Sequence, residues 1–131
     1  MLAEEEIAAM EVLYRAGQYR QVITHSCMAI EYLLKTKLIQ IDSTSEYLYG
    51  HDIINIFKTV QEKYGSSKDL HSIVRFCRKY HNESRYPMTS MAVFTKEFAE
   101  QFVKYVEDTK YYIDNECPAT LEDLVNRFKN D

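Results

Sequence analysis

Helix breakers are scarce along this chain, and their scarcity constrains the fold more than any other feature. The 131 residues include only three glycines and two prolines. With so few positions where regular structure must stop, long helices are favoured over many short strands. The composition is 46% hydrophobic, which is ordinary for a globular protein, and the length suits one domain with its own core. We therefore expect a single all-helical domain over residues 1–131.

Apolar side chains recur with helical spacing in successive segments of the chain. The expected helices cover about residues 3–15, 18–40, 53–64, 68–84 and 95–112, with a short terminal helix over 120–129. Because the loops between them are short, neighbouring helices are expected to run antiparallel. The sequence thus predicts an all-α, up-and-down bundle of four to six antiparallel helices, with its core in about residues 4–115.

Individual residues carry more specific expectations. Asp52 and Thr95 precede apolar periodic segments and are expected to cap the helices that follow them. Cys27 and Cys77 fall on apolar stripes and are expected in the core, whereas Cys117, next to a proline, is expected to be more exposed. Three cysteines at these spacings match no disulfide or metal framework, so reduced thiols and a cytoplasmic location are expected.

Several function classes are disfavoured by composition. No window approaches the roughly 18 uninterrupted apolar residues of a membrane span, and the first residues are acidic, unlike a signal peptide. Histidine and carboxylate spacing matches no metal site, and scattered glycines build no phosphate loop, so neither a metal nor a cofactor is expected. The net charge is −4, so any site for a polyanion must be local.

One basic run stands out in this acidic chain. Between Arg75 and Arg85 the local net charge is +3. A helical projection gathers five polar residues within a sector of roughly 120°: Arg75, Arg78, His81, Asn82 and Arg85. Guanidinium groups match phosphate oxygens, and an adjacent imidazole can act as general acid or base, which would allow RNA cleavage by the 2′-hydroxyl without a metal. The alternative is structural, since basic residues are common at helix C-termini.

Three short motifs, in this order and separation, resemble those of the HEPN domain (higher eukaryotes and prokaryotes nucleotide-binding), in the branch with an Arg-Tyr-Pro ending. They are Ala-x-Glu-x-x-x-Lys from Ala29 to Lys35, Gly50-His51-Asp52, and Arg85-Tyr86-Pro87. The resemblance spans about residues 4–115 and implies an HEPN-like helical bundle.

The resemblance also implies what the basic run does. It implies that nucleotide or RNA phosphates are bound by Arg78, His81, Asn82, Arg85 and Tyr86. Many HEPN ribonucleases carry an arginine, four to six residues, and then a histidine, a spacing that is similar to Arg75 and His81. These two residues are therefore the candidate catalytic pair of a metal-independent ribonuclease. The chain departs from the nuclease pattern at Phe76, where a polar residue is usual.

Partners follow from the same resemblance. It implies a homodimer, a minimal nucleotidyltransferase as partner, and a place in a toxin–antitoxin or related defence system. The alternative from another class is a non-catalytic dimeric helical protein-interaction module, whose basic patch contacts an acidic protein.

Two further features have simpler interpretations. Glu31 and Lys35 are spaced i, i+4 and are interpreted as a surface ion pair. The chain has eleven tyrosines and no tryptophan. Some of them are expected either to stack on bases or to form a semi-polar dimer interface. The tyrosines concerned are Tyr80, Tyr86, Tyr105, Tyr111 and Tyr112.

Overall fold

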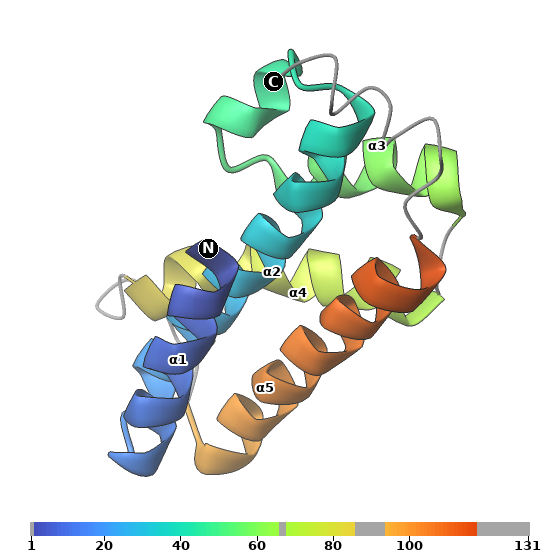
Figure 1. The fold of residues 1–131 in the computed structure, drawn as a ribbon. Helices are drawn as coiled ribbons and strands as arrows, with labels where there is room; N and C mark the ends of the chain where they lie inside the picture. Colours follow the sequence, from blue (N-terminus) through green and yellow to red (C-terminus); the bar gives the residue numbers. More distant parts are fainter. Residues whose placement is uncertain (1, 66–67, 86–93, 118–131) are drawn as a thin grey trace.

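A computed structural model describes residues 2–65, 68–85 and 94–117 (Figure 1). Within these ranges the chain forms α-helices and short helical turns and contains no strand. The elements are α1 (Leu2–Arg15), α2 (Tyr19–Ile41), the 3-10 turn η1 (Glu46–Tyr49), α3 (Ile53–Tyr64), α4 (Lys68–Arg85), α5 (Lys96–Tyr111) and the π-helical turn η3 (Tyr112–Glu116). The predicted all-α bundle is confirmed, and the predicted helix ends lie within about one residue of those observed.

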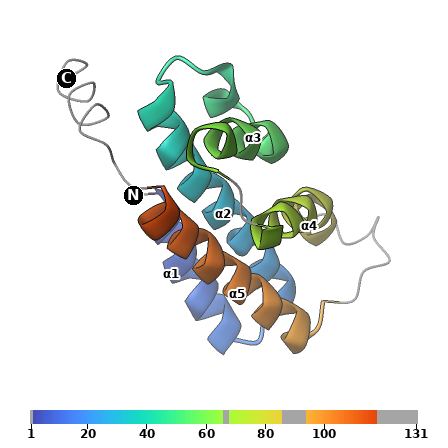
Figure 2. The same cartoon turned by 90° about the vertical axis from the view of Figure 1, so that its right-hand side faces the viewer.

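Helix α2 is the centre of the bundle and contacts each of the other four helices. It forms an antiparallel hairpin with α1, and α5 lies along the same pair (Figures 1 and 2). Helix α4 crosses these helices at a steep angle, and α3 packs near the C-terminal half of α2. The crossing brings the middle of α2, the start of α3 and the second half of α4 together.

Local sequence explains where these helices begin and end. Both predicted N-caps are confirmed: the Asp52 carboxylate accepts a hydrogen bond from the backbone N–H of Asn55 at 3.3 Å, and the Thr95 hydroxyl accepts one from Phe98 at 3.1 Å. Gly17 ends α1 with φ of +74°, a left-handed conformation that favours glycine and lets the chain reverse into α2.

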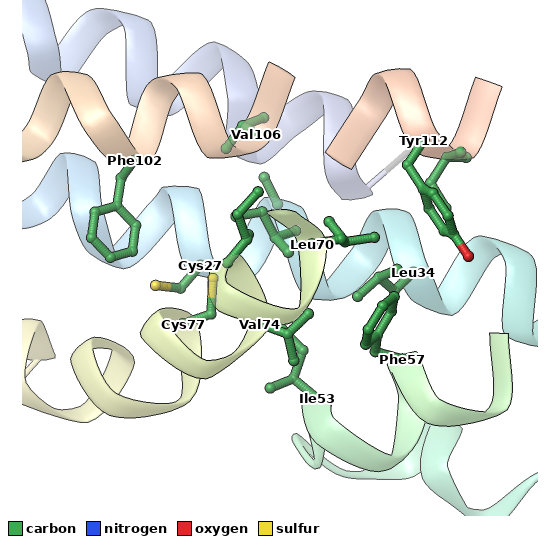
Figure 3. Packing of buried hydrophobic residues seen from close by; sticks show 14 of the residues in the cluster. Cys27, Leu34, Ile53, Phe57, Leu70, Val74, Cys77, Phe102, Val106 and Tyr112 are labelled. Atoms are coloured by element: carbon green, nitrogen blue, oxygen red, sulfur yellow. The ribbon is translucent and has the colours of Figure 1, made fainter. Parts of the chain in front are cut away.

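The core lies along one stripe of α2 and the faces of α3, α4 and α5 that meet it (Figure 3). Cys27 and Cys77 are buried as predicted, with their sulfur atoms side by side between α2 and α4. Leu70, Ile73 and Val74 of α4 are buried beside Cys77. Burying one such aliphatic side chain stabilises the fold by roughly 1.5–3 kcal/mol. None of the described helices is both long and apolar enough to cross a membrane.

The end of α5 differs from expectation. Cys117 is fully buried rather than exposed, because the π-helical turn carries the chain back against the core. Tyr112 is buried too, and its hydroxyl donates a 2.7 Å hydrogen bond to the carbonyl oxygen of Gly65. It therefore offers no surface for stacking on bases. The predicted terminal helix at 120–129 and Tyr86 lie outside the described residues.

Candidate functional site

A cleft of about 450 Å³ opens where α2, the start of α3 and α4 meet. Helix α4 brings its basic flank to this cleft because its apolar arc is fixed against α2. The segment before α3 enters from the opposite side, where the Asp52 cap starts the helix. The residues that line the cleft are Cys27 and Glu31 from α2, His51, Asp52, Ile53, Ile54 and Asn55 around the start of α3, and Cys77, Arg78, His81 and Asn82 from α4.

The structure brings together only some of the predicted site residues. Arg78, His81 and Asn82 all line the cleft. Arg75 does not, since it faces a neighbouring open hollow that also includes Lys79. Arg85 is exposed at the end of α4. A phosphate site built on Arg78, His81 and Asn82 thus has a geometric basis, whereas the catalytic pairing of Arg75 with His81 stays a prediction.

The opposite side of the cleft holds a buried acid. The side chain of Glu31 is only 3% exposed, and its carboxylate contacts Lys35 Nζ at 3.3 Å and His51 Nδ1 at 2.9 Å. Lys35 Nζ also donates a 2.6 Å hydrogen bond to the carbonyl oxygen of Gly50, beside His51. The interpretation of Glu31 and Lys35 as a surface pair is therefore wrong, because Glu31 lies on the core stripe of α2. A buried charge needs such partners to offset its lost hydration.

His81 lies deeper in the cleft than its helical projection suggests. Burial lowers the pKa of its imidazole, and the nearby Arg85 and His51 side chains lower it further, although the Glu31 carboxylate opposes them. Its ring meets the ring of His51 edge-on, with the centroids 6.3 Å apart. Its Nε2 is buried and has no hydrogen-bond partner among the described residues. With this lowered pKa the ring is uncharged at neutral pH. Its Nε2 can then either accept or donate one hydrogen bond, depending on the tautomer.

Charge divides the cleft into two walls. The α4 wall offers donors, from the guanidinium of Arg78 and the amide of Asn82. The wall from α2 and the start of α3 offers the acidic groups of Glu31 and Asp52 and the imidazole of His51. Within the described ranges no three histidine, cysteine, aspartate or glutamate side chains are grouped so as to hold a metal ion. The cleft is therefore suited to a ligand that carries an anion and hydrogen-bond donors.

Comparison with known families agrees with this architecture. The family model described as HEPN domain matches residues 2–110, which is most of the chain. The chain belongs to the HEPN family. The predicted family membership is confirmed, and the cleft of this HEPN domain lies wholly inside the matched region. No curated protein and no solved structure matches the chain. HEPN membership is consistent with a function related to nucleotides or RNA. Assignment to the Arg-Tyr-Pro branch stays a prediction.

Sequence reasoning missed the role of Glu31 and His51 in the cleft of this HEPN domain. They are 20 residues apart, and a single sequence carries no signal that they are in contact. Both residues belong to the family motifs named above, but those motifs do not say that the two side chains meet. Glu31 carried one further signal. It stands three residues before Leu34 and four after Cys27, so a charged residue interrupts an apolar stripe. A charge in such a position needs partners, and Glu31 has two, the partly buried Lys35 and the exposed His51.

Proposed function

We propose that this HEPN domain binds nucleotide or RNA phosphates in the cleft between α2, α3 and α4. The observation that carries the proposal is the convergence of Arg78, His81 and Asn82 on one hollow large enough for part of a nucleotide. Arg78 is exposed at the cleft, so its guanidinium can form charge-assisted hydrogen bonds with phosphate oxygens. Arg85 adds positive charge near His81.

Direct binding measurements test the proposal. Adenosine 5′-monophosphate and a short RNA oligonucleotide are titrated into the chain, and affinity and melting temperature are recorded. We expect Arg78→Ala to weaken binding about tenfold, as for the loss of a hydrogen bond to a charged group, and Arg85→Ala to weaken it less. Arg15→Ala is the matched control, because Arg15 is exposed at the end of α1, away from the cleft. If neither ligand binds at millimolar concentration, the proposal is wrong.

We also propose that the chain forms a homodimer. An exposed aromatic surface on α4 and α5 supports this proposal. Phe76 is 40% exposed and stacks on Tyr105, with ring centroids 5.9 Å apart and planes 3° from parallel. Aromatic residues are enriched at protein interfaces. Light scattering should give twice the monomer mass, and Phe76→Asp should shift it toward the monomer; a monomeric wild-type chain would contradict the proposal.

A minimal nucleotidyltransferase partner and a toxin–antitoxin or defence role are part of the same proposal and rest on the family. If a small nucleotidyltransferase is encoded beside this chain, co-expression and co-purification of the two proteins test them. If instead an acidic protein binds through Arg78 and Arg85 and no nucleotide binds, the non-catalytic interaction module is the correct alternative.

A further inference from the structure

His51 is held in an unusual way for an exposed residue. Its side chain is 61% exposed, yet its Nδ1 contacts both oxygens of the buried Glu31 carboxylate, at 2.9 and 3.2 Å. The carboxylate is itself fixed by Lys35, which also binds the carbonyl oxygen of the adjacent Gly50. Both the ring and the backbone that carries it are therefore anchored to α2. Such an arrangement orients a histidine more firmly than an exposed loop otherwise would.

The contact with Glu31 also selects the tautomer of His51. An ionised carboxylate can only accept hydrogen bonds, so the neutral ring must carry its proton on Nδ1. Nε2, on the ring edge away from Glu31, is then an acceptor. No partner for this atom occurs among the described residues, and the ring lines the cleft. The structure therefore presents one fixed hydrogen-bond acceptor opposite the donors of α4.

We infer that His51 is a specificity-determining residue that accepts a hydrogen bond from a ribose hydroxyl of the ligand, with Glu31 as its positioning residue. The inference rests on the proposed function, and it names the ligand class as ribonucleotide rather than deoxyribonucleotide. A ribonucleotide carries an anion for Arg78 and Asn82 and, a few bonds away, hydroxyl donors for Nε2. The 2′-hydroxyl is the group by which proteins distinguish RNA from DNA. A site with an acceptor placed for that group loses a hydrogen bond with any analogue that lacks it.

Three trinucleotides of one sequence test the inference: RNA, DNA, and RNA with 2′-O-methyl groups, which cannot donate from the 2′ position. Wild type should bind the RNA about fivefold more tightly than either analogue, the size expected for one neutral hydrogen bond. His51→Asn keeps an amide near the position of Nδ1 but has no atom at Nε2. It should bind all three ligands to within about twofold of one another and bind the DNA as wild type does. His71→Asn is the matched control, since His71 is exposed on α4 and packs on Phe57 instead of lining the cleft.

Glu31→Gln tests the positioning role separately. The Lys35 ammonium can only donate, so the glutamine oxygen should turn toward Lys35 and its amide N–H₂ toward His51. The preferred His51 tautomer should then change from Nδ1–H to Nε2–H, which ¹⁵N NMR of the ring nitrogens detects even if the variant is less stable. The preference for RNA should fall with it, because Nε2 becomes a donor.

The outcomes separate this inference from the proposed function. If no trinucleotide binds, both are wrong. If all three bind wild type equally, or if His51→Asn keeps the preference for RNA, the inference is wrong while phosphate binding stands. If Arg78→Ala weakens the binding of all three ligands equally and His51→Asn weakens only that of the RNA, two separate roles are supported. Arg78 then binds the phosphate, and His51 binds the ribose hydroxyl.

Discussion

Two histidine–glutamate pairs join different parts of this molecule to α2, and their surroundings differ. His25 on α2 pairs with Glu6 on α1, and both side chains are partly exposed, at 35% and 23%. In the cleft the exposures are unequal, because the Glu31 side chain is 3% exposed and that of His51 61%. The first pair links two helices at the surface. The second uses a buried charge to hold an exposed imidazole in one orientation.

The largest expected difference between the pairs is in stability. Glu31→Ala should lower the free energy of unfolding by about 3 kcal/mol, because it removes the carboxylate that pairs with the partly buried Lys35 ammonium and leaves a cavity. Glu6→Ala should lower it by about 1 kcal/mol or less, since exposed pairs contribute little. Urea denaturation measures both values. Equal losses would show that the two pairs are equivalent and contradict the comparison.

Lys35 offers a second and smaller test. Lys35→Met keeps most of the apolar stem but removes the ammonium that binds Glu31 and the Gly50 carbonyl oxygen. We expect a loss of about 1–2 kcal/mol and faster amide exchange around His51, because the segment before α3 loses its tie to α2. Lys58→Met on the exposed face of α3 is the control and should change stability by no more than about 0.5 kcal/mol. If amide exchange around His51 is unchanged in Lys35→Met, Lys35 does not anchor this segment to α2.

Asp52 is a second acidic residue that lines the cleft, and it differs from Glu31 because its carboxylate caps α3. Asp52→Ala should cost about 1 kcal/mol, whereas Asp52→Asn, which can still cap, should cost a few tenths. Calorimetry of both variants checks this order, and nucleotide affinity should stay near that of wild type in Asp52→Asn. A large loss of affinity in that variant would mean that the carboxylate contacts the ligand.

The smallest effect concerns pH. Because burial lowers the pKa of His81, the unfolded chain takes up a proton near pH 6.5, whereas the folded chain takes it up only at lower pH. This residue therefore makes stability fall as the pH drops below about 7. His81→Asn should flatten this part of the profile, as measured by melting temperature at each pH. His71→Asn serves as the matched substitution, because His71 is an exposed histidine of α4 outside the cleft. If melting temperature falls with pH equally in wild type and His81→Asn, His81 is not the source of the pH dependence.

The bundle was predictable because its signals are local. These signals are apolar spacing, the lack of helix breakers and the capping residues Asp52 and Thr95, and each acts within a few residues. The helices and both caps that they predicted were confirmed. The burial of Cys117 was not predictable in this way, since it depends on a π-helical turn that returns the chain to the core.

The cleft was predictable on one wall only. Arg78, His81 and Asn82 share a flank of one helix, so a helical projection groups them. The other wall depends on how α4 crosses α2 and on a loop that brings His51 back to Glu31. Those contacts join residues 20 or more apart, and no pattern of spacing along the chain encodes them. Arg75 lines a neighbouring hollow that shares Arg78 with the cleft, so its pairing with His81 stays a prediction.

The shared carboxylate of Glu31 has a consequence for how this chain can vary. A single buried acid satisfies one cation from its own helix and one imidazole from a distant loop. A substitution at position 31 therefore leaves two groups in need of new partners, while a substitution at 35 or 51 leaves the acid half satisfied. Among related sequences, we expect the residues at positions 31, 35 and 51 to change together or not at all, so that they are inherited as one unit.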